Sequence, residues 1–170
     1  SREVKRMDTR DLSLSAIFTG LYAALVYFLA GISFGLVQVR VADALFPLSM
    51  VFGWPVVVGV TLGCLIGNVV SPMPSIITDM TLGALANFIA SLVAWKIGSR
   101  KGGERANELL GCVAATAVVT FVVGTYLAWL TQTNIWIWWL GVGVGSIISI
   151  IALGYMLIQG VKKAGVHPPE

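Results

Sequence analysis

The stretch Gln38-Val39-Arg40-Val41-Ala42-Asp43-Ala44 places an arginine and an aspartate three residues apart in a chain that otherwise avoids charge. Between Leu12 and Trp95 the only other charged residue is Asp79, and positions 109–161 contain none. An ionisable side chain in the hydrocarbon core of a membrane costs about 2.5–3.5 kcal/mol on insertion scales, so it persists mainly where it is paired or used. These three charges therefore mark the candidate functional site.

The composition indicates a helical membrane protein. The chain is 57% hydrophobic and 11% charged, whereas soluble domains carry about 25% charged residues. Its apolar stretches are continuous and do not alternate with period two, which favours helices over strands. The net charge of +3 does not indicate nucleic-acid binding, because the cations lie at the ends of apolar stretches, where membrane topology explains them. We predict an all-α, polytopic fold.

Six apolar stretches reach or approach the roughly 20 residues that a helix needs to cross a membrane. We expect one transmembrane domain over residues 1–170, with spans at about 12–31, 40–53, 56–70, 77–97, 109–130 and 136–159. The first stretch is too long for a signal-peptide core, so we expect it to stay as a span. The second and third are short, and we expect them to be tilted or packed inside the bundle.

The positions of lysine and arginine predict the orientation. Lysine and arginine both occur near the N-terminus and in the polar loop at 96–108, and the C-terminal tail carries Lys162 and Lys163, whereas the loops at 32–39, 71–76 and 131–135 contain neither residue type. Basic segments stay on the cytoplasmic side. Four spans before the basic loop and two after it meet this condition, and both termini are then cytoplasmic.

Small residues at four-residue spacing mark two helix faces that other helices can approach closely. One face is Ala16, Gly20 and Ala24, and the other is Gly59, Gly63 and Gly67. Cys64 and Cys112 both fall within apolar stretches and show no metal-ligand spacing, so we expect buried structural thiols and no metal site.

With this topology, polar and aromatic residues from four segments lie near the outer leaflet. They are Arg40, Asp43, Asn68, Asp79, Gln132, Asn134, Trp136, Trp138 and Trp139. Asn87 lies about two helical turns deeper than Asp79, within roughly 80° of its face. The convergence predicts a pocket that is open to the outside. Its aromatic walls, carboxylates and amides suit a planar heterocycle, because a carboxylate accepts two hydrogen bonds from an aminopyrimidinone edge.

Each of these residues also has a purely structural interpretation. Arg40 and Asp43 can pair with each other and hold the second span at the interface. Asn68 can join two helices, and Asp79 can complement a helix dipole. The tryptophans can form an aromatic belt at the membrane surface. The sequence leaves these alternatives open.

The segments Ser33–Leu45 and Gly59–Pro72, followed by Asp79 and Gly83, resemble the queuosine-precursor transporter (QueT) family, whose members are substrate-binding S components of energy-coupling factor (ECF) transporters. The resemblance implies a six-helix S-component fold with an extracellular site for a 7-deazaguanine, such as queuine or an earlier precursor. It implies that the binding positions include Arg40, Asp43, Asn68 and Asp79. It also implies that the Ala16, Gly20 and Ala24 face contacts the transmembrane coupling subunit.

The chain contains no phosphate-binding G-x-x-x-x-G-K-[ST] loop, so if transport is driven by ATP, the nucleotide-binding domains must be separate subunits. The resemblance implies two such ATP-binding subunits. Its single histidine, His167, lies in the tail beside two prolines, and we expect neither catalytic residues nor a cofactor. Two alternatives stay open. The chain can be an S component for another vitamin-like heterocycle, or a stand-alone secondary transporter in which Asp43 or Asp79 carries a proton.

Overall fold

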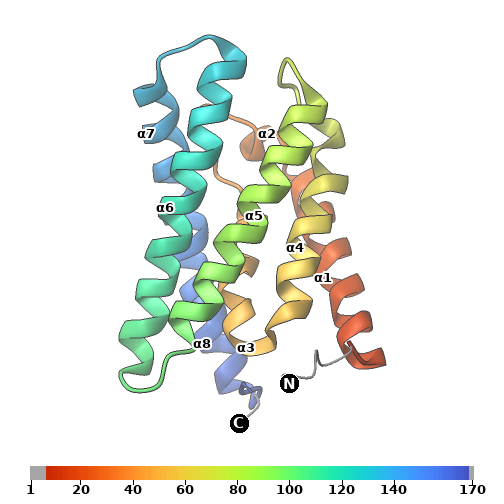
Figure 1. The fold of residues 1–170 in the computed structure, drawn as a ribbon, viewed down its shortest axis with the longest axis vertical. Coiled ribbons are helices and arrows are strands. Elements are labelled where there is room, and N and C mark those ends of the chain that lie inside the picture. The colour runs from red at the N-terminus through yellow and green to blue at the C-terminus, as the bar shows by residue number, and fades with distance from the viewer. Residues whose placement is uncertain (1–6, 169–170) are drawn as a thin grey trace, which may run out of the picture.

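The computed structural model describes residues 7–168, and their regular secondary structure is entirely helical (Figure 1). The elements are α1 (Thr9–Phe28), α2 (Ala30–Ser33), η1 (Val41–Leu48), α3 (Ser49–Phe52), α4 (Trp54–Gly67), η2 (Asn68–Val70), α5 (Ile76–Gly98), α6 (Glu104–Thr131), α7 (Ile135–Ser146), η3 (Ile147–Gly154) and α8 (Tyr155–Lys163). Elements η1 and η2 are 3-10 helices, and η3 is a π-helical stretch that joins α7 to α8. The all-helical prediction is confirmed.

Four helical segments in residues 7–168 are long and apolar enough to cross a membrane. They are Thr9–Phe28, Ile76–Gly98, Glu104–Thr131 and the continuous run Ile135–Lys163. Two shorter apolar segments, Val41–Phe52 and Trp54–Val70, coincide with the two stretches predicted to be short. Each of the six predicted spans therefore overlaps a helical segment. The number of segments that cross the membrane stays a prediction.

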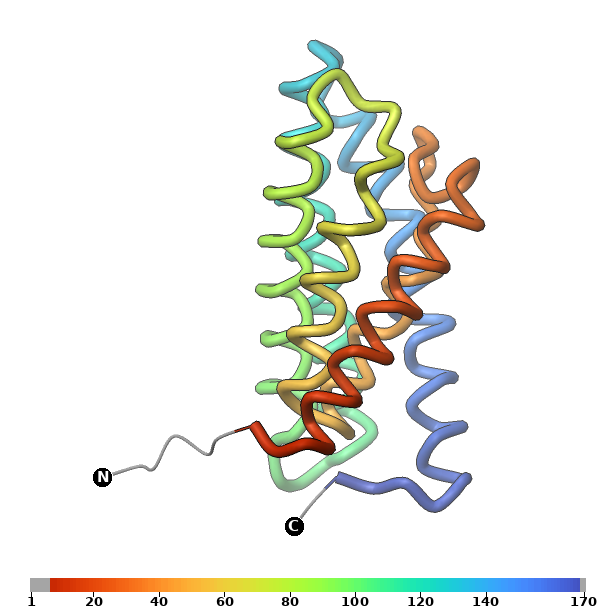
Figure 2. The backbone as a smooth tube through the Cα atoms, turned by 90° about the vertical axis from the view of Figure 1, so that its right-hand side faces the viewer, coloured from red at the N-terminus to blue at the C-terminus, as the bar shows by residue number. Residues whose placement is uncertain are grey.

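The basic segments lie at one end of the bundle. The start of α1, the α5–α6 turn and the end of α8 share that end, and the α4–α5 and α6–α7 turns lie at the other (Figures 1 and 2). Positions 2, 5 and 6, which carry three of the N-terminal cations, lie outside the described residues. The predicted loop at 96–108 is shorter than expected, because α5 continues to Gly98 and α6 begins at Glu104.

Glycines bring α4 against α1. A Cβ atom at Gly63 would lie 2.6 Å from the Cβ atom of Tyr22, and one at Gly67 would lie 3.0 Å from that of Val26. Gly59 is equally close to Phe18. The predicted close-packing face at 59, 63 and 67 is therefore confirmed, and it holds Tyr22 toward the interior.

The second apolar stretch begins as a 3-10 helix rather than an α-helix. Pro47 lies inside η1 and lacks the backbone N–H that an α-helix would use at that position. The chain before η1, from Phe34 to Arg40, has no regular helix and crosses α7. A Cβ atom at Gly141 or Gly145 of α7 would collide with a backbone carbonyl of this segment, at Leu36 and Gln38 respectively. These two glycines therefore allow the segment to lie directly on the helix.

Candidate functional site

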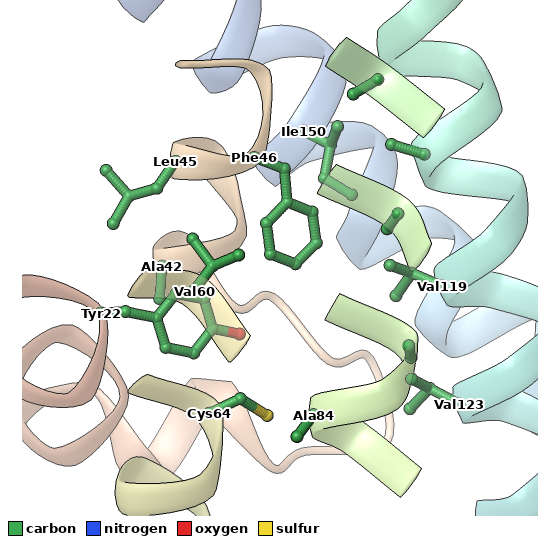
Figure 3. Packing of buried hydrophobic residues seen from close by; sticks show 14 of the residues in the cluster. Tyr22, Ala42, Leu45, Phe46, Val60, Cys64, Ala84, Val119, Val123 and Ile150 are labelled. Carbon is green, nitrogen blue, oxygen red and sulfur yellow. The ribbon is translucent and has the colours of Figure 1, made fainter. Parts of the chain in front are cut away.

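Polar side chains are gathered inside the bundle, toward the end away from the basic segments. We call them the polar cluster, and its members are Tyr22, Gln38, Arg40, Asp43, Cys64, Asn68, Ser71, Asp79 and Tyr126. None is more than 6% exposed, although the surrounding core is apolar. Figure 3 shows Tyr22 of α1 and Cys64 of α4 among the core residues, with Ala84 of α5 beside the cysteine. Segments (helices and loops) from five separate stretches of the sequence thus contribute to one buried site.

Asp79 connects four of these segments. Its carboxylate accepts hydrogen bonds from Ser71 Oγ at 2.5 Å and from the Tyr126 hydroxyl at 2.6 Å. Its backbone oxygen accepts from Asn68 Nδ2 at 3.1 Å. The helix-dipole interpretation is therefore incomplete, since Asp79 also joins α5 to α6, to η2 and to the loop that follows η2. Hydrogen bonds to an ionised group are among the stronger ones in proteins.

The Asp43 carboxylate is hydrogen-bonded to a tyrosine and is not paired with Arg40, which lies three residues before it. Its carboxylate accepts from the Tyr22 hydroxyl at 2.6 Å, and no ion pair joins it to Arg40 within 4.0 Å. Arg40 precedes η1 with an extended backbone (φ −93°, ψ 94°), so its side chain does not follow the i, i+3 geometry of a helix. The interpretation in which these two charges serve only to pair with each other is wrong.

Arg40 has only weak partners. Its Nη1 atom donates to Cys64 Sγ at 3.8 Å and its Nη2 atom to Gln38 Oε1 at 3.5 Å. Its guanidinium carbon lies 5.2 Å from the centre of the Phe34 ring. Within residues 7–168 no carboxylate comes within 4.0 Å of this buried cation, and its Nε atom has no hydrogen-bond partner. A buried charge without a strong partner is destabilising, and a binding role for Arg40 stays a prediction.

Gly83 lies where several members of the polar cluster meet. A Cβ atom at this position would lie 2.9 Å from Asn68 Nδ2, 3.2 Å from Cys64 Sγ and 3.3 Å from the Tyr126 hydroxyl. The missing side chain therefore lets groups from α4, η2 and α6 converge on α5.

The structure does not bring every predicted residue into the polar cluster. Asn87 is buried, but its Nδ2 atom donates to the Val60 backbone oxygen at 2.9 Å and so joins α5 to α4. Gln132 and Asn134 are exposed at the α6–α7 turn. The Gln132 side chain donates to the Trp129 carbonyl at 2.7 Å, and Asn134 caps α7 by accepting from the Trp136 amide at 2.9 Å.

The three predicted tryptophans surround the same turn. Trp136 is 64% exposed, whereas Trp138 is buried and donates to the hydroxyls of Thr131 and Thr133. Trp139 is half-buried, and its indole nitrogen lies 3.1 Å from Thr125 Oγ1. These contacts hold α6 and α7 together, and a role in substrate binding stays a prediction.

Sequence reasoning missed Tyr22, Gln38, Ser71 and Tyr126 as members of the polar cluster. The two tyrosines lie within apolar helices, where no motif distinguishes them from core residues. Cys64 and Cys112 are free and buried, as predicted, and Cys64 proves to contact Arg40. The signal available for the tyrosines was their hydroxyl group, because a buried tyrosine usually needs a hydrogen-bond partner.

A separate cavity of about 720 Å³ lies at the basic end of the bundle. Trp54, Trp95, Arg100, Glu108 and Lys162 are among its lining residues. Glu108 is already bound there by an ion pair with Lys162. No member of the polar cluster lines this cavity.

The fold and the apolar helices define a class: a helical membrane protein with a cluster of polar side chains buried inside the bundle. The model of the QueT transporter family matches residues 12–163, so the chain belongs to this family. It is a membrane transporter protein and not an enzyme. No curated protein and no solved structure matched the chain.

Proposed function

We propose that the chain is the substrate-binding membrane subunit, or S component, of an ATP-driven ECF importer for a 7-deazaguanine such as queuine or an earlier queuosine precursor. Membership of the QueT transporter family supports this substrate class. The observation that carries the proposal is the buried Arg40 guanidinium, which has no carboxylate within 4.0 Å in the described residues and is surrounded by further polar groups. Such a group keeps its hydrogen-bonding capacity for a ligand.

The polar cluster suits a neutral, flat base. Arg40 supplies a donor, Asn68 supplies an amide, and the two aspartates accept hydrogen bonds. Each aspartate already accepts from at least one tyrosine hydroxyl, so a ligand does not need a positive charge to satisfy them. A ligand with donors and acceptors on one edge can bind such a mixed set.

We propose that the ligand arrives from outside the cell. Asn68, Ser71 and Asp79 lie at or beside the α4–α5 turn, which is at the end opposite the basic segments (Figure 1). Positively charged loops are typical of the cytoplasmic side. Six membrane spans with both termini cytoplasmic follow from that orientation. Gln132, Asn134, Trp136, Trp138 and Trp139 then lie at the outer end of the bundle, and Asn87 supports the polar cluster from the cytoplasmic side.

The small-residue face of α1 is free to contact a partner subunit in the membrane. Ala16 and Gly20 are exposed and Ala24 is half-buried, and a Cβ atom at Gly20 would meet nothing within 4 Å. Internal packing therefore does not account for this face. We propose that it contacts the transmembrane coupling subunit, which connects the chain to two ATP-binding subunits.

A thermal-shift screen of the detergent-purified chain tests the proposed substrate. The candidates are queuine, its 7-deazaguanine precursors, guanine and common vitamins. Because a ligand that binds only the folded state raises its stability, we expect the 7-deazaguanines to raise the melting temperature most. A shift with a vitamin and with none of the deazaguanines would instead identify an S component for another heterocycle.

A further inference from the structure

Two polar atoms of the cluster face the interior without a hydrogen-bond partner among the described residues. They are Arg40 Nε, a donor, and Asn68 Oδ1, an acceptor. Asn68 is 0% exposed and Arg40 is 5% exposed, so bulk water does not satisfy them. A buried polar atom without a partner is destabilising, and such atoms are rare in folded proteins.

The orientation of the Asn68 amide follows from its neighbour. The backbone oxygen of Asp79 can only accept a hydrogen bond, so the amide nitrogen must face it, at 3.1 Å. The amide oxygen then points away from Asp79. The acceptor is therefore fixed in place and available to a donor from a ligand.

The two atoms belong to one small region of the cluster. Arg40 Nη1 lies 3.8 Å from Cys64 Sγ. A Cβ atom at Gly83 would lie 3.2 Å from the same sulfur and 2.9 Å from Asn68 Nδ2. Both the arginine and the asparagine therefore lie near Cys64. Any side chain at position 83 would push the asparagine away from its place.

We infer that Arg40 Nε and Asn68 Oδ1 together recognise a lactam edge of the ligand, and that Gly83 is the positioning residue that sets Asn68. Arg40 donates to the ring carbonyl, and Asn68 accepts from the adjacent ring N–H. A lactam presents this acceptor and this donor side by side, which matches the two unpartnered atoms. This inference rests on the proposed function, because it assigns the hydrogen bonds of that same site.

Equilibrium binding of three bases to the purified full chain tests this assignment, with the affinity of each base as the measured quantity. 7-Deazaguanine and 7-deazahypoxanthine carry the lactam, whereas 2-amino-7-deazapurine lacks both its carbonyl and its ring N–H. We expect wild type to bind 2-amino-7-deazapurine at least about tenfold more weakly than 7-deazaguanine, because two buried polar atoms stay unsatisfied. 7-Deazahypoxanthine keeps most of the affinity.

We expect the variants Asn68→Leu and Gly83→Ala to bind 7-deazaguanine and 2-amino-7-deazapurine with more similar affinities, so that the ratio of the two dissociation constants falls toward one. Thr116→Val and Gly143→Ala are matched controls that should leave this ratio at the wild-type value. The Thr116 hydroxyl makes its hydrogen bond within its own helix, and a Cβ atom at Gly143 makes ordinary van der Waals contacts at 3.4 Å. A loss of affinity by the same factor for every base would show that Asn68 and Gly83 are merely structural. If Gly83→Ala does not fold, Asn68→Leu, which is close in size to asparagine, makes the same test.

The outcomes separate the two proposals. If wild type binds none of the three bases, the proposed 7-deazaguanine site is wrong. If wild type binds 7-deazaguanine but prefers it to 2-amino-7-deazapurine by less than about twofold, the lactam assignment is wrong and the proposed function stands.

Discussion

Replacing Tyr126 with phenylalanine tests whether Asp79 organises the polar cluster. The substitution removes one hydroxyl, which donates to the Asp79 carboxylate at 2.6 Å. Donor and acceptor are 6% and 1% exposed, so water does not replace the lost bond. Hydrogen bonds to charged groups contribute about 1.5–3 kcal/mol to stability. We therefore expect Tyr126→Phe to lower the free energy of unfolding by about 2 kcal/mol.

Equilibrium unfolding of the purified chain in mixed detergent micelles measures this change. Tyr155→Phe is the matched control, because Tyr155 is half-buried and its hydroxyl makes no hydrogen bond within residues 7–168. Ser71→Ala removes the other hydroxyl that donates to the same carboxylate. The two losses should not add, since both bonds share one acceptor. A Tyr126→Phe variant no less stable than Tyr155→Phe would refute the role assigned to Asp79.

Three further perturbations probe packing, coupling and energy supply. Gly63→Ala places a Cβ atom 2.6 Å from that of Tyr22, and we expect it to lower the free energy of unfolding by about 1–3 kcal/mol, whereas Gly143→Ala should change it far less. The leucine of Gly20→Leu extends into open space on α1, so ligand binding by the isolated chain should stay at the wild-type level. Co-purification with the coupling subunits should be lost, and unchanged co-purification would contradict the proposed interface. In liposomes, the chain alone should not take up 7-deazaguanine under a proton gradient, and uptake should require the coupling subunits and ATP; gradient-driven uptake by the chain alone would establish the secondary-transporter alternative.

The fold was predictable because its signals are long and repeated. Continuous apolar stretches predicted the helices, and the four-residue glycine spacing from Gly59 to Gly67 predicted a close-packing face, which the structure shows packed against α1. The form of η1 was less accessible, because a single Pro47 does not distinguish a 3-10 helix from a kinked α-helix. The crossing of α7 by residues 34–40 depends on Gly141 and Gly145, whose spacing resembles that of any helix-packing face.

The site was predictable in its charged members and in Asn68. Arg40, Asp43 and Asp79 were noticed because charge is rare in the chain, and Asn68 because it shares their side of the bundle. Tyr22 and Tyr126 carry no such signal, since each lies in an apolar helix and gains its role from a carboxylate on another element. The alternative in which Arg40 and Asp43 only pair with each other is wrong for a related reason: the extended backbone at Arg40 is set by tertiary packing.

Ligand binding and stability of Arg40→Met, measured on the same sample, test the central claim most directly. Methionine nearly fills the space of the arginine stem but removes a buried cation that has no carboxylate within 4.0 Å. Exchanging a buried charge for an apolar group of similar size is often neutral or stabilising. If Arg40 is kept for the ligand, the variant should be at least as stable as wild type and should bind 7-deazaguanine at least about tenfold more weakly. Undiminished binding, or a large loss of stability, would contradict the assignment of the polar cluster as the substrate site.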